Sequence, residues 1–306
     1  MSKKIVFMGT PEIAGIILEQ LMAEPLYAPQ CIITQPDQRV GKKQIRSAPP
    51  VKIIAQKHHL MVWQPESLRD ASLIERLQEW KPDCIIVAAY GKMIPKEIWS
   101  LPPYQTLNIH PSLLPRYRGP SPVPFTLLAG DQETGVTIMR INAGMDTGDI
   151  LAQTSLTIEH NETALDLQKK LFTLGGKLLI NILPQWFAGK ITPIPQQHQE
   201  ATITPLLKKA DGMIQLYQSA REIERMVRAF NPWPGVFLSL PQGRTLKIHK
   251  VKIDTTQTGK EPLALFLNEH KALCLATREG TLILEEVQCD SKKPMSGYTF
   301  FLGFRG

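Results

Sequence analysis

The chain has 306 residues, of which 43% are hydrophobic and 21% charged, and this is enough for two ordinary domains with their own cores. No segment approaches the ~18 apolar residues of a membrane span, and Cys31, Cys84, Cys274 and Cys289 lack the spacing of zinc ligands or of a disulfide framework, so we expect no membrane partner, no metal and free thiols. The net charge of +7 favours a polyanionic partner.

The first third of the chain alternates short apolar runs with segments of helical periodicity. Residues 5–8 form such a run, and Gly9-Thr10-Pro11 and a helical pattern follow it, which predicts a strand, a turn and a helix. Thr10 is a residue type that caps helices, and Pro11 suits a first helical turn. The same patterns predict strands at 31–34 and 84–89 and a helix at 66–80.

Uniformly apolar strands that alternate with helices are typical of a parallel sheet covered on both faces. Ligands of such sheets bind at the carboxyl ends of the strands. The segments in which we expect a site are therefore 9–12, 35–50, 89–95 and 108–120.

The second half of the chain begins with a helix and ends in short strands. We predict a helix at 163–188, interrupted at Gly175-Gly176, a polar, Pro-rich linker at 190–207 and a helix at 219–230. Alternating runs at 246–251, 263–267, 272–276 and 282–287 predict a small β-barrel or sandwich.

The excess of basic residues lies mainly in the last third of the chain. Residues 208–306 carry 15 Lys/Arg and 10 Asp/Glu, a balance of +5, whereas residues 1–189 carry 19 and 17, a balance of +2. Contact with a phosphate backbone would therefore involve the last third.

Two short motifs carry the side chains that suggest chemistry. Alternation along a strand end places Asn108 and His110 on one face, where an amide and an imidazole can donate to a developing oxyanion. Asp146 lies between glycines in Gly144-Met-Asp-Thr-Gly148, a loop free to bring a carboxylate beside His110. Taken separately, each motif is also compatible with a hydrogen-bonded turn or an acidic surface turn.

The reaction class follows from what accompanies these side chains. Ser112 lacks the context of a nucleophilic serine, and the chain contains neither a Gly-rich phosphate loop nor a dinucleotide-binding fingerprint. An oxyanion site with a proton acceptor fits acyl-type transfer to an amine that the substrate supplies.

The joint pattern resembles the 10-formyltetrahydrofolate-dependent formyltransferases. The resemblance rests on Asn108-x-His110 with Ser-Leu-Leu-Pro at 112–115, followed by Gly-x-Asp-Thr-Gly around Asp146. It implies an α/β, Rossmann-like domain in which Asn108 and His110 stabilise the oxyanion formed when an amine attacks the formyl carbon. Asp146 would position His110 and help to remove the amine proton.

Within that superfamily the chain is similar to the methionyl-tRNA branch. Met8-Gly-Thr-Pro-Glu12, Asn231-Pro-Trp-Pro234 and Lys292-Lys-Pro-Met295 are among the matching runs. The resemblance implies a catalytic domain at 1–189, a linker at 190–207 and an oligonucleotide-binding (OB)-like tRNA-binding barrel at 208–306. It also implies transfer of a formyl group from 10-formyltetrahydrofolate to initiator methionyl-tRNA, by a protein that we expect to be cytoplasmic and monomeric.

The resemblance assigns further roles residue by residue. The roles are catalysis for Asn108, His110 and Asp146; folate binding for Ala89, Tyr90, Gly91, Met93, Ser112, Leu113, Leu114 and Pro115; and tRNA binding for Arg39, Lys42, Lys43 and Arg46. Arg116 and Arg118 are either anion ligands or structural ion-pair partners. Trp233 either stacks on nucleic acid or packs at a domain junction.

Two other functions remain open at this point. The same three catalytic residues would serve a formyltransferase whose acceptor is a small amine, such as an amino sugar nucleotide. A non-catalytic nucleic-acid-binding protein would explain the basic last third, but it leaves the combination of Asn108, His110 and Asp146 without a purpose.

Overall fold

A computed structural model describes residues 3–40, 44–256, 259–290 and 292–303. The chain forms two compact units that are not continuous in sequence. The first unit comprises Met1–Pro122, Glu133–Thr157 and Gln168–Thr204, and the second comprises Val123–Gln132, Ile158–Leu167 and Pro205–Gly306. Of residues 190–207, predicted as a linker, 190–204 cluster with the first unit and 205–207 with the second.

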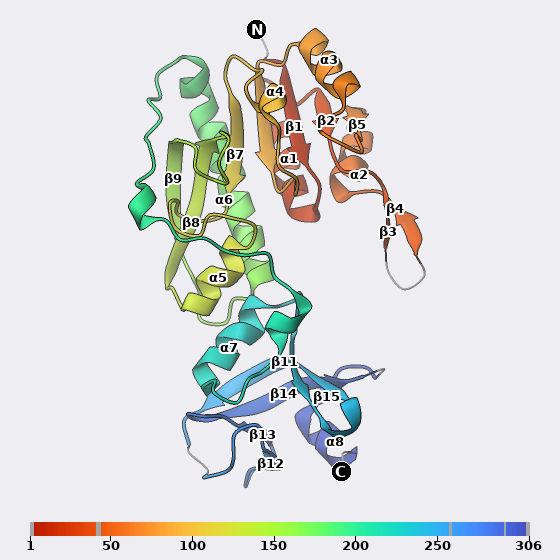
Figure 1. Ribbon diagram of the computed structural model, residues 1–306, viewed down its shortest axis with the longest axis vertical. Helices are drawn as coiled ribbons and strands as arrows, with labels where there is room; N and C mark the ends of the chain where they lie inside the picture. The colour runs from red at the N-terminus through yellow and green to blue at the C-terminus, as the bar shows by residue number, and fades with distance from the viewer. Residues whose placement is uncertain (1–2, 41–43, 257–258, 291, 304–306) are drawn as a thin grey trace. The chain divides into compact units, whose positions relative to one another are not determined.

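A seven-stranded sheet forms the centre of the first unit (Figure 1). Its spatial order is β5 (Met61–Trp63), β2 (Cys31–Ile33), β1 (Ile5–Gly9), β6 (Cys84–Ala88), β7 (Thr106–His110), β8 (Glu133–Arg140) and β9 (Ile150–Thr157). The first five run parallel, and β8 and β9 are antiparallel to their neighbours. The parallel strands are short and almost wholly apolar, as expected for strands that helices cover on both faces.

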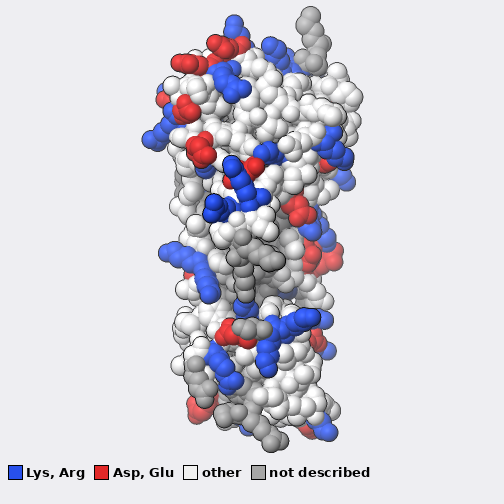
Figure 2. Space-filling view, turned by 90° about the vertical axis from the view of Figure 1, so that its right-hand side faces the viewer, with Lys and Arg blue, Asp and Glu red and all other residues white. Residues whose placement is uncertain are grey.

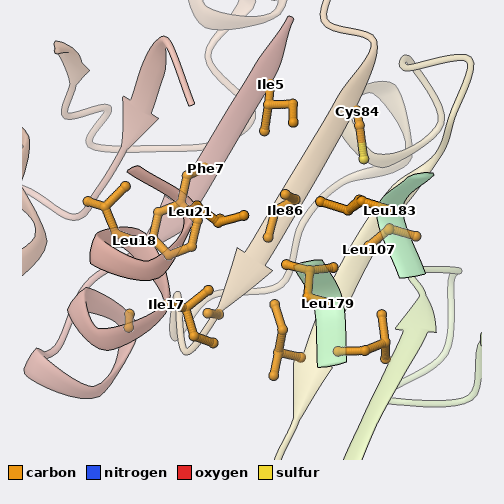
Figure 3. Packing of buried hydrophobic residues seen from close by; sticks show 14 of the residues in the cluster. Ile5, Phe7, Ile17, Leu18, Leu21, Cys84, Ile86, Leu107, Leu179 and Leu183 are labelled. Carbon is orange, nitrogen blue, oxygen red and sulfur yellow. The ribbon is translucent and has the colours of Figure 1, made fainter. Parts of the chain in front are cut away.

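Helices cover both faces of this sheet. Helices α1 (Glu12–Met22), α2 (Pro50–Lys57) and α6 (Ala164–Phe187) pack on one face, and α3 (Ala71–Trp80) and α4 (Lys96–Trp99) pack on the other. Figure 3 shows Phe7 of β1 against Leu18 and Leu21 of α1, and Leu107 of β7 near Leu179 and Leu183 of α6. The predicted Rossmann-like α/β class is confirmed.

The core contact of α6 gives a stability prediction. We expect Leu179→Ala to lower the free energy of unfolding by about 2–5 kcal/mol, because the fully buried side chain leaves a cavity between helix and sheet. Urea unfolding followed by circular dichroism measures the change. Lys177→Ala, at an exposed position of the same helix, is the control and should shift it by less than about 0.5 kcal/mol. Equal effects of the two substitutions would contradict this packing.

Three local sequence predictions were wrong. Helix α6 runs without a break through Gly175 and Gly176; a Cβ on Gly175 would lie 2.7 Å from Ile109 Cγ2, so this glycine serves close helix–sheet approach. Thr10 does not cap α1, because its hydroxyl donates to the Tyr90 carbonyl and Pro11 is the N-cap residue. The helix predicted from residue 66 begins at Ala71, behind an Asp70 cap.

A two-stranded hairpin follows β2 and protrudes from the first unit (Figure 1). Strands β3 (Gln38–Val40) and β4 (Ile45–Ser47) pair in antiparallel fashion. At the root of the hairpin, Asp37 accepts hydrogen bonds from Lys52 and Gln64. The Lys52 ammonium group, 2.8 Å away, lowers the pKa of the Asp37 carboxyl.

The second unit contains a curled antiparallel sheet in the order β10 (Val236–Ser239), β11 (Thr245–Asp254), β14 (Thr281–Cys289), β13 (Leu273–Ala276) and β12 (Leu265–Leu267), with β15 (Met295–Ser296) beside β14. This sheet confirms the predicted small barrel-type domain. The remaining helices are α5 (Pro122–Ala129), α7 (Ala220–Ala229) and α8 (Gly297–Gly303). Ser219 and Glu222 cap α7 reciprocally.

Two chemical expectations concern the cysteines and the membrane. All four cysteines are free, as predicted, and all four are buried. Among the helices of the described residues, none has the length and apolar character that crossing a bilayer demands.

Candidate active site

A cavity of about 450 Å³ opens at the carboxyl ends of β6 and β7, where a parallel sheet is expected to bind its ligand. This volume is within the usual range for small-molecule sites. Apolar side chains, among them Val87, Ile94 and Phe172, form much of its wall. All three predicted catalytic residues line it: Asn108, His110 and Asp146.

Strand β7 brings Asn108 and His110 to the cavity. Residues two apart on a strand face the same side, and both side chains line the cavity as expected. No hydrogen bond holds the Asn108 amide to another residue in the described parts of the chain. The amide NH₂ is therefore available to a ligand.

The His110 ring is held at one nitrogen and open at the other. The residue is only 4% exposed, and its Nε2 lies 2.9 Å from the Tyr117 carbonyl oxygen. Because a carbonyl can only accept, Nε2 carries a proton and donates it there. The nitrogen that faces Asp146 is thus Nδ1, which lies 3.6 Å from the Asp146 carboxylate.

The Asp146 carboxylate is held by its loop in a conformation that favours this approach. Its backbone has φ +52°, in the left-handed region that aspartate tolerates better than most residues. The Asp146 Oδ2 atom accepts a hydrogen bond of 2.8 Å from the Gly119 amide. Gly148 lies directly against the Arg140 carbonyl, where a side chain would not fit. The loop therefore fixes both the position and the orientation of the Asp146 carboxylate.

The eight predicted folate residues fall into two groups. Ala89, Tyr90, Gly91 and Met93 line the cavity, in a turn with positive φ at Ala89 and Gly91. Thr10 and Gln35 both donate to the Tyr90 carbonyl and fix this turn. Burial raises the pKa of the Tyr90 phenol to about 12, so it stays protonated at physiological pH.

The structure does not bring Ser112, Leu113, Leu114 and Pro115 to this cavity. Ser112 is buried and donates to the Arg116 carbonyl, and the Leu114 amide donates to the Thr137 hydroxyl. These residues form a turn that leads the chain from His110 to Tyr117, whose carbonyl holds the imidazole.

The two arginines of that turn differ in their surroundings. Arg116 is exposed and lies over the Tyr117 ring. Arg118 is 6% exposed and donates to Gln196 and His198, so it is an internal structural partner. In the second unit, Trp233 is 57% exposed; it is not part of the core of that unit.

Two of the four predicted tRNA contacts lie on the hairpin, and Lys42 and Lys43 lie outside the described residues. Arg39 and Arg46 are exposed and directly opposite each other across the strands. Two like charges in such a pair repel each other, and a phosphate between them would relieve the repulsion. Figure 2 faces the side from which the hairpin protrudes and shows Lys and Arg side chains scattered among Asp and Glu.

The described residues contain no group of three or more His, Cys, Asp or Glu arranged to hold a metal ion.

The sequence analysis did not identify Gln196, whose side chain contacts the backbone of the Asp146 loop. This residue stands among polar and proline residues in which no periodicity distinguishes it.

Two family models match the chain. The model of the formyl transferase family matches residues 3–183, and that of the formyl transferase C-terminal domain matches residues 206–305. A methionyl-tRNA formyltransferase of Roseiflexus castenholzii is 41% identical over 305 residues, which cover 100% of this chain and 97% of the relative.

Solved structures share the fold at low identity. The N-formyltransferase of Helicobacter canadensis, solved with folinic acid and dTDP-3-aminofucose, has a TM-score of 0.68 at 20% identity; the match covers 93% of this chain and 99% of that one. HypX of Aquifex aeolicus in complex with tetrahydrofolic acid has a TM-score of 0.65 at 18% identity, covering 98% of this chain and 47% of that one.

Proposed function

The chain belongs to the methionyl-tRNA formyltransferase family, and on this premise we propose that its cavity transfers a formyl group from 10-formyltetrahydrofolate to the amino group of initiator methionyl-tRNA. The observation that carries this proposal is the meeting of Asn108, His110 and Asp146 around one cavity. We also propose that the protein acts in the cytoplasm, where initiator tRNA is used in translation. We propose further that it acts as a monomer.

The residues present suit the donor. 10-Formyltetrahydrofolate supplies an activated formyl carbon. The turn at Ala89–Tyr90–Gly91 and Met93 gives the flat pterin an apolar wall with backbone groups beside it. Asn108, whose amide can donate, lines the same space.

The chain's own groups would act as follows. The Asn108 amide donates to the formyl oxygen, where negative charge develops. The amino nitrogen would bond to the formyl carbon as the bond from that carbon to N10 of the folate breaks. His110 donates its Nε2 proton to the Tyr117 carbonyl, so it is not an oxyanion donor as the sequence suggested. It can instead receive, on Nδ1, the proton that the amine loses, with Asp146 at 3.6 Å stabilising the imidazolium, and return that proton to N10. Because α-amino groups titrate near pH ~7.7–8.0, part of the acceptor is already neutral at physiological pH, so orientation and charge stabilisation suffice.

An alternative function would differ only in the acceptor of the formyl group. A small amine acceptor would use the same cavity, and the Helicobacter structure with an amino sugar nucleotide shares this fold. The exposed arginine pair of the hairpin and the basic last third favour the polyanionic acceptor. Incubation with 10-formyltetrahydrofolate and methionyl-tRNA, followed by mass analysis of the released amino acid, should give N-formylmethionine; formylation of an amino sugar nucleotide instead would support the rival.

The hairpin gives a prediction about the acceptor. We expect the double substitution Arg39→Ala/Arg46→Ala to raise the KM for methionyl-tRNA roughly tenfold and to flatten the slope of log(kcat/KM) against log[salt] by about two, since two phosphate contacts are lost. Steady-state kinetics between low and physiological salt measure both quantities.

The matched control keeps the charge. Arg39→Lys/Arg46→Lys should retain the salt slope, although lysine lacks the planar fork of arginine. A KM for methionyl-tRNA that does not depend on salt in the unsubstituted protein would argue against phosphate contacts at the hairpin.

A further inference from the structure

The chain segment at residues 196–204, which we term the strap, runs along the turn that carries Tyr117 and Gly119. The Arg118 amide donates to the Thr202 carbonyl at 2.9 Å, and the Thr204 amide donates back to the Arg118 carbonyl at 2.8 Å. The hydroxyl of Thr202 accepts from the Tyr117 amide. The strap therefore fixes the backbone of residues 117–119 from outside the cavity.

That backbone holds two catalytic side chains. The Tyr117 carbonyl accepts from Nε2 of His110, and the Gly119 amide donates to Oδ2 of Asp146. Any shift of the turn would move the imidazole and the carboxylate relative to each other. The strap therefore acts on His110 and Asp146 through the turn, which makes one hydrogen bond to each of these side chains.

Gln196, at the start of the strap, makes a second connection to the Asp146 loop. Its side chain is 6% exposed. Its Oε1 accepts from Nε and Nη2 of Arg118 at 3.0 and 2.7 Å, and its Nε2 donates to the carbonyls of Asp146 and Gly148 at 2.9 and 2.7 Å. A carboxamide has two donor and two acceptor positions, and here all four are used.

The chemistry of the partners fixes the orientation of this amide. A guanidinium can only donate and a carbonyl can only accept, so exchange of the amide oxygen and nitrogen would break all four hydrogen bonds. The Arg118 cation that Gln196 holds also interacts with the Asp146 carboxylate; burial lowers the pKa of Arg118, and Asp146 opposes this effect.

We propose that Gln196 is a positioning residue for formyl transfer, which joins the turn at 117–119 to the loop of Asp146 and thereby sets the distance from His110 to Asp146. The inference rests on the proposed function. Asp146 has a left-handed backbone, a conformation that persists in proteins where neighbouring contacts over-determine it. The two hydrogen bonds from Gln196 are such contacts, because Gln196 donates to the carbonyls of Asp146 and of Gly148 on the same loop.

Gln196→Glu separates positioning from folding. The glutamate keeps the oxygen that accepts from Arg118, so the buried cation stays paired. Its second oxygen cannot donate, so it faces the carbonyls of Asp146 and Gly148 without a hydrogen bond and repels them. We expect kcat to fall roughly 10- to 100-fold, the cost of a displaced catalytic group, while the KM for 10-formyltetrahydrofolate stays within about twofold. Gln197→Leu, at the exposed neighbouring position, is the control and should retain wild-type kcat.

A double-mutant cycle distinguishes positioning from general damage. If Gln196 acts through Asp146, Gln196→Glu should change kcat by less than about twofold when Asp146→Asn is already present, because the group it positions is gone. Single-turnover assays with enzyme in excess measure the residual rates, and tetrahydrofolate binding counts the folded sites.

The outcomes separate this inference from the proposed function. Full reduction of kcat by Gln196→Glu in both backgrounds, or an unchanged kcat in the wild-type background, would overturn the positioning role. Wild-type protein that does not formylate methionyl-tRNA would overturn the proposed function and this inference together.

Discussion

Asp146→Asn is expected to lower kcat for formyl transfer by about 10²- to 10⁴-fold, the range for loss of a group that assists proton transfer. The asparagine is nearly the same size, tolerates the left-handed backbone of this position, and can still accept from the Gly119 amide. What it lacks is the negative charge 3.6 Å from Nδ1 of His110. The loss therefore reports on charge rather than on loop geometry.

The comparison with Asp146→Ala makes this separation measurable. Alanine loses the charge and the hydrogen bond together, and its side chain disfavours the left-handed conformation, so it should also destabilise the loop. Affinity for methionyl-tRNA, measured at fixed salt, should stay within about twofold for both variants, because the carboxylate lies in the cavity wall. An asparagine variant that keeps activity within a few-fold of wild type would exclude Asp146 from the chemistry.

The sequence predicted the centre of the site because its geometry is local. Strand alternation places Asn108 and His110 on one face whatever the rest of the chain does, and β7 has that geometry. The glycines around Asp146 indicated an unusual backbone, which the structure has at φ +52°. The Asp146 loop lies beside His110 because β8, which precedes the loop, pairs with β7. A short sequence pattern does not indicate which strands pair.

Residues whose role depends on distant partners could not be predicted. Gln196 is one polar residue among several, and its buried contacts come from residues 48 to 78 positions away. Strand β5 has three residues and an exposed end, too short for any periodicity to appear. Ser112 is part of the motif that identifies the family, yet its hydroxyl donates to the Arg116 carbonyl and shapes a turn. A motif thus indicates which residues matter without telling which of them face the substrate.

The second large effect is expected for Asn108→Ala, which should lower kcat by about 10²- to 10³-fold, as the loss of one oxyanion donor does. The Asn108 amide has no hydrogen-bond partner elsewhere in the described residues, so its removal leaves no other side chain unsatisfied. The reduction should thus appear in kcat with little change in the midpoint of thermal unfolding.

The matched variant for this position is Asn108→Asp, which preserves size but replaces the donor by an acceptor. If the amide donates to the developing oxyanion, the aspartate should be at least as inactive as the alanine, because it adds repulsion at the same atom. If the amide serves only to shape the cavity, the aspartate should be the milder change. Because the half-buried strand position is the same in both variants, the order of their rates decides between these roles without any assumption about stability.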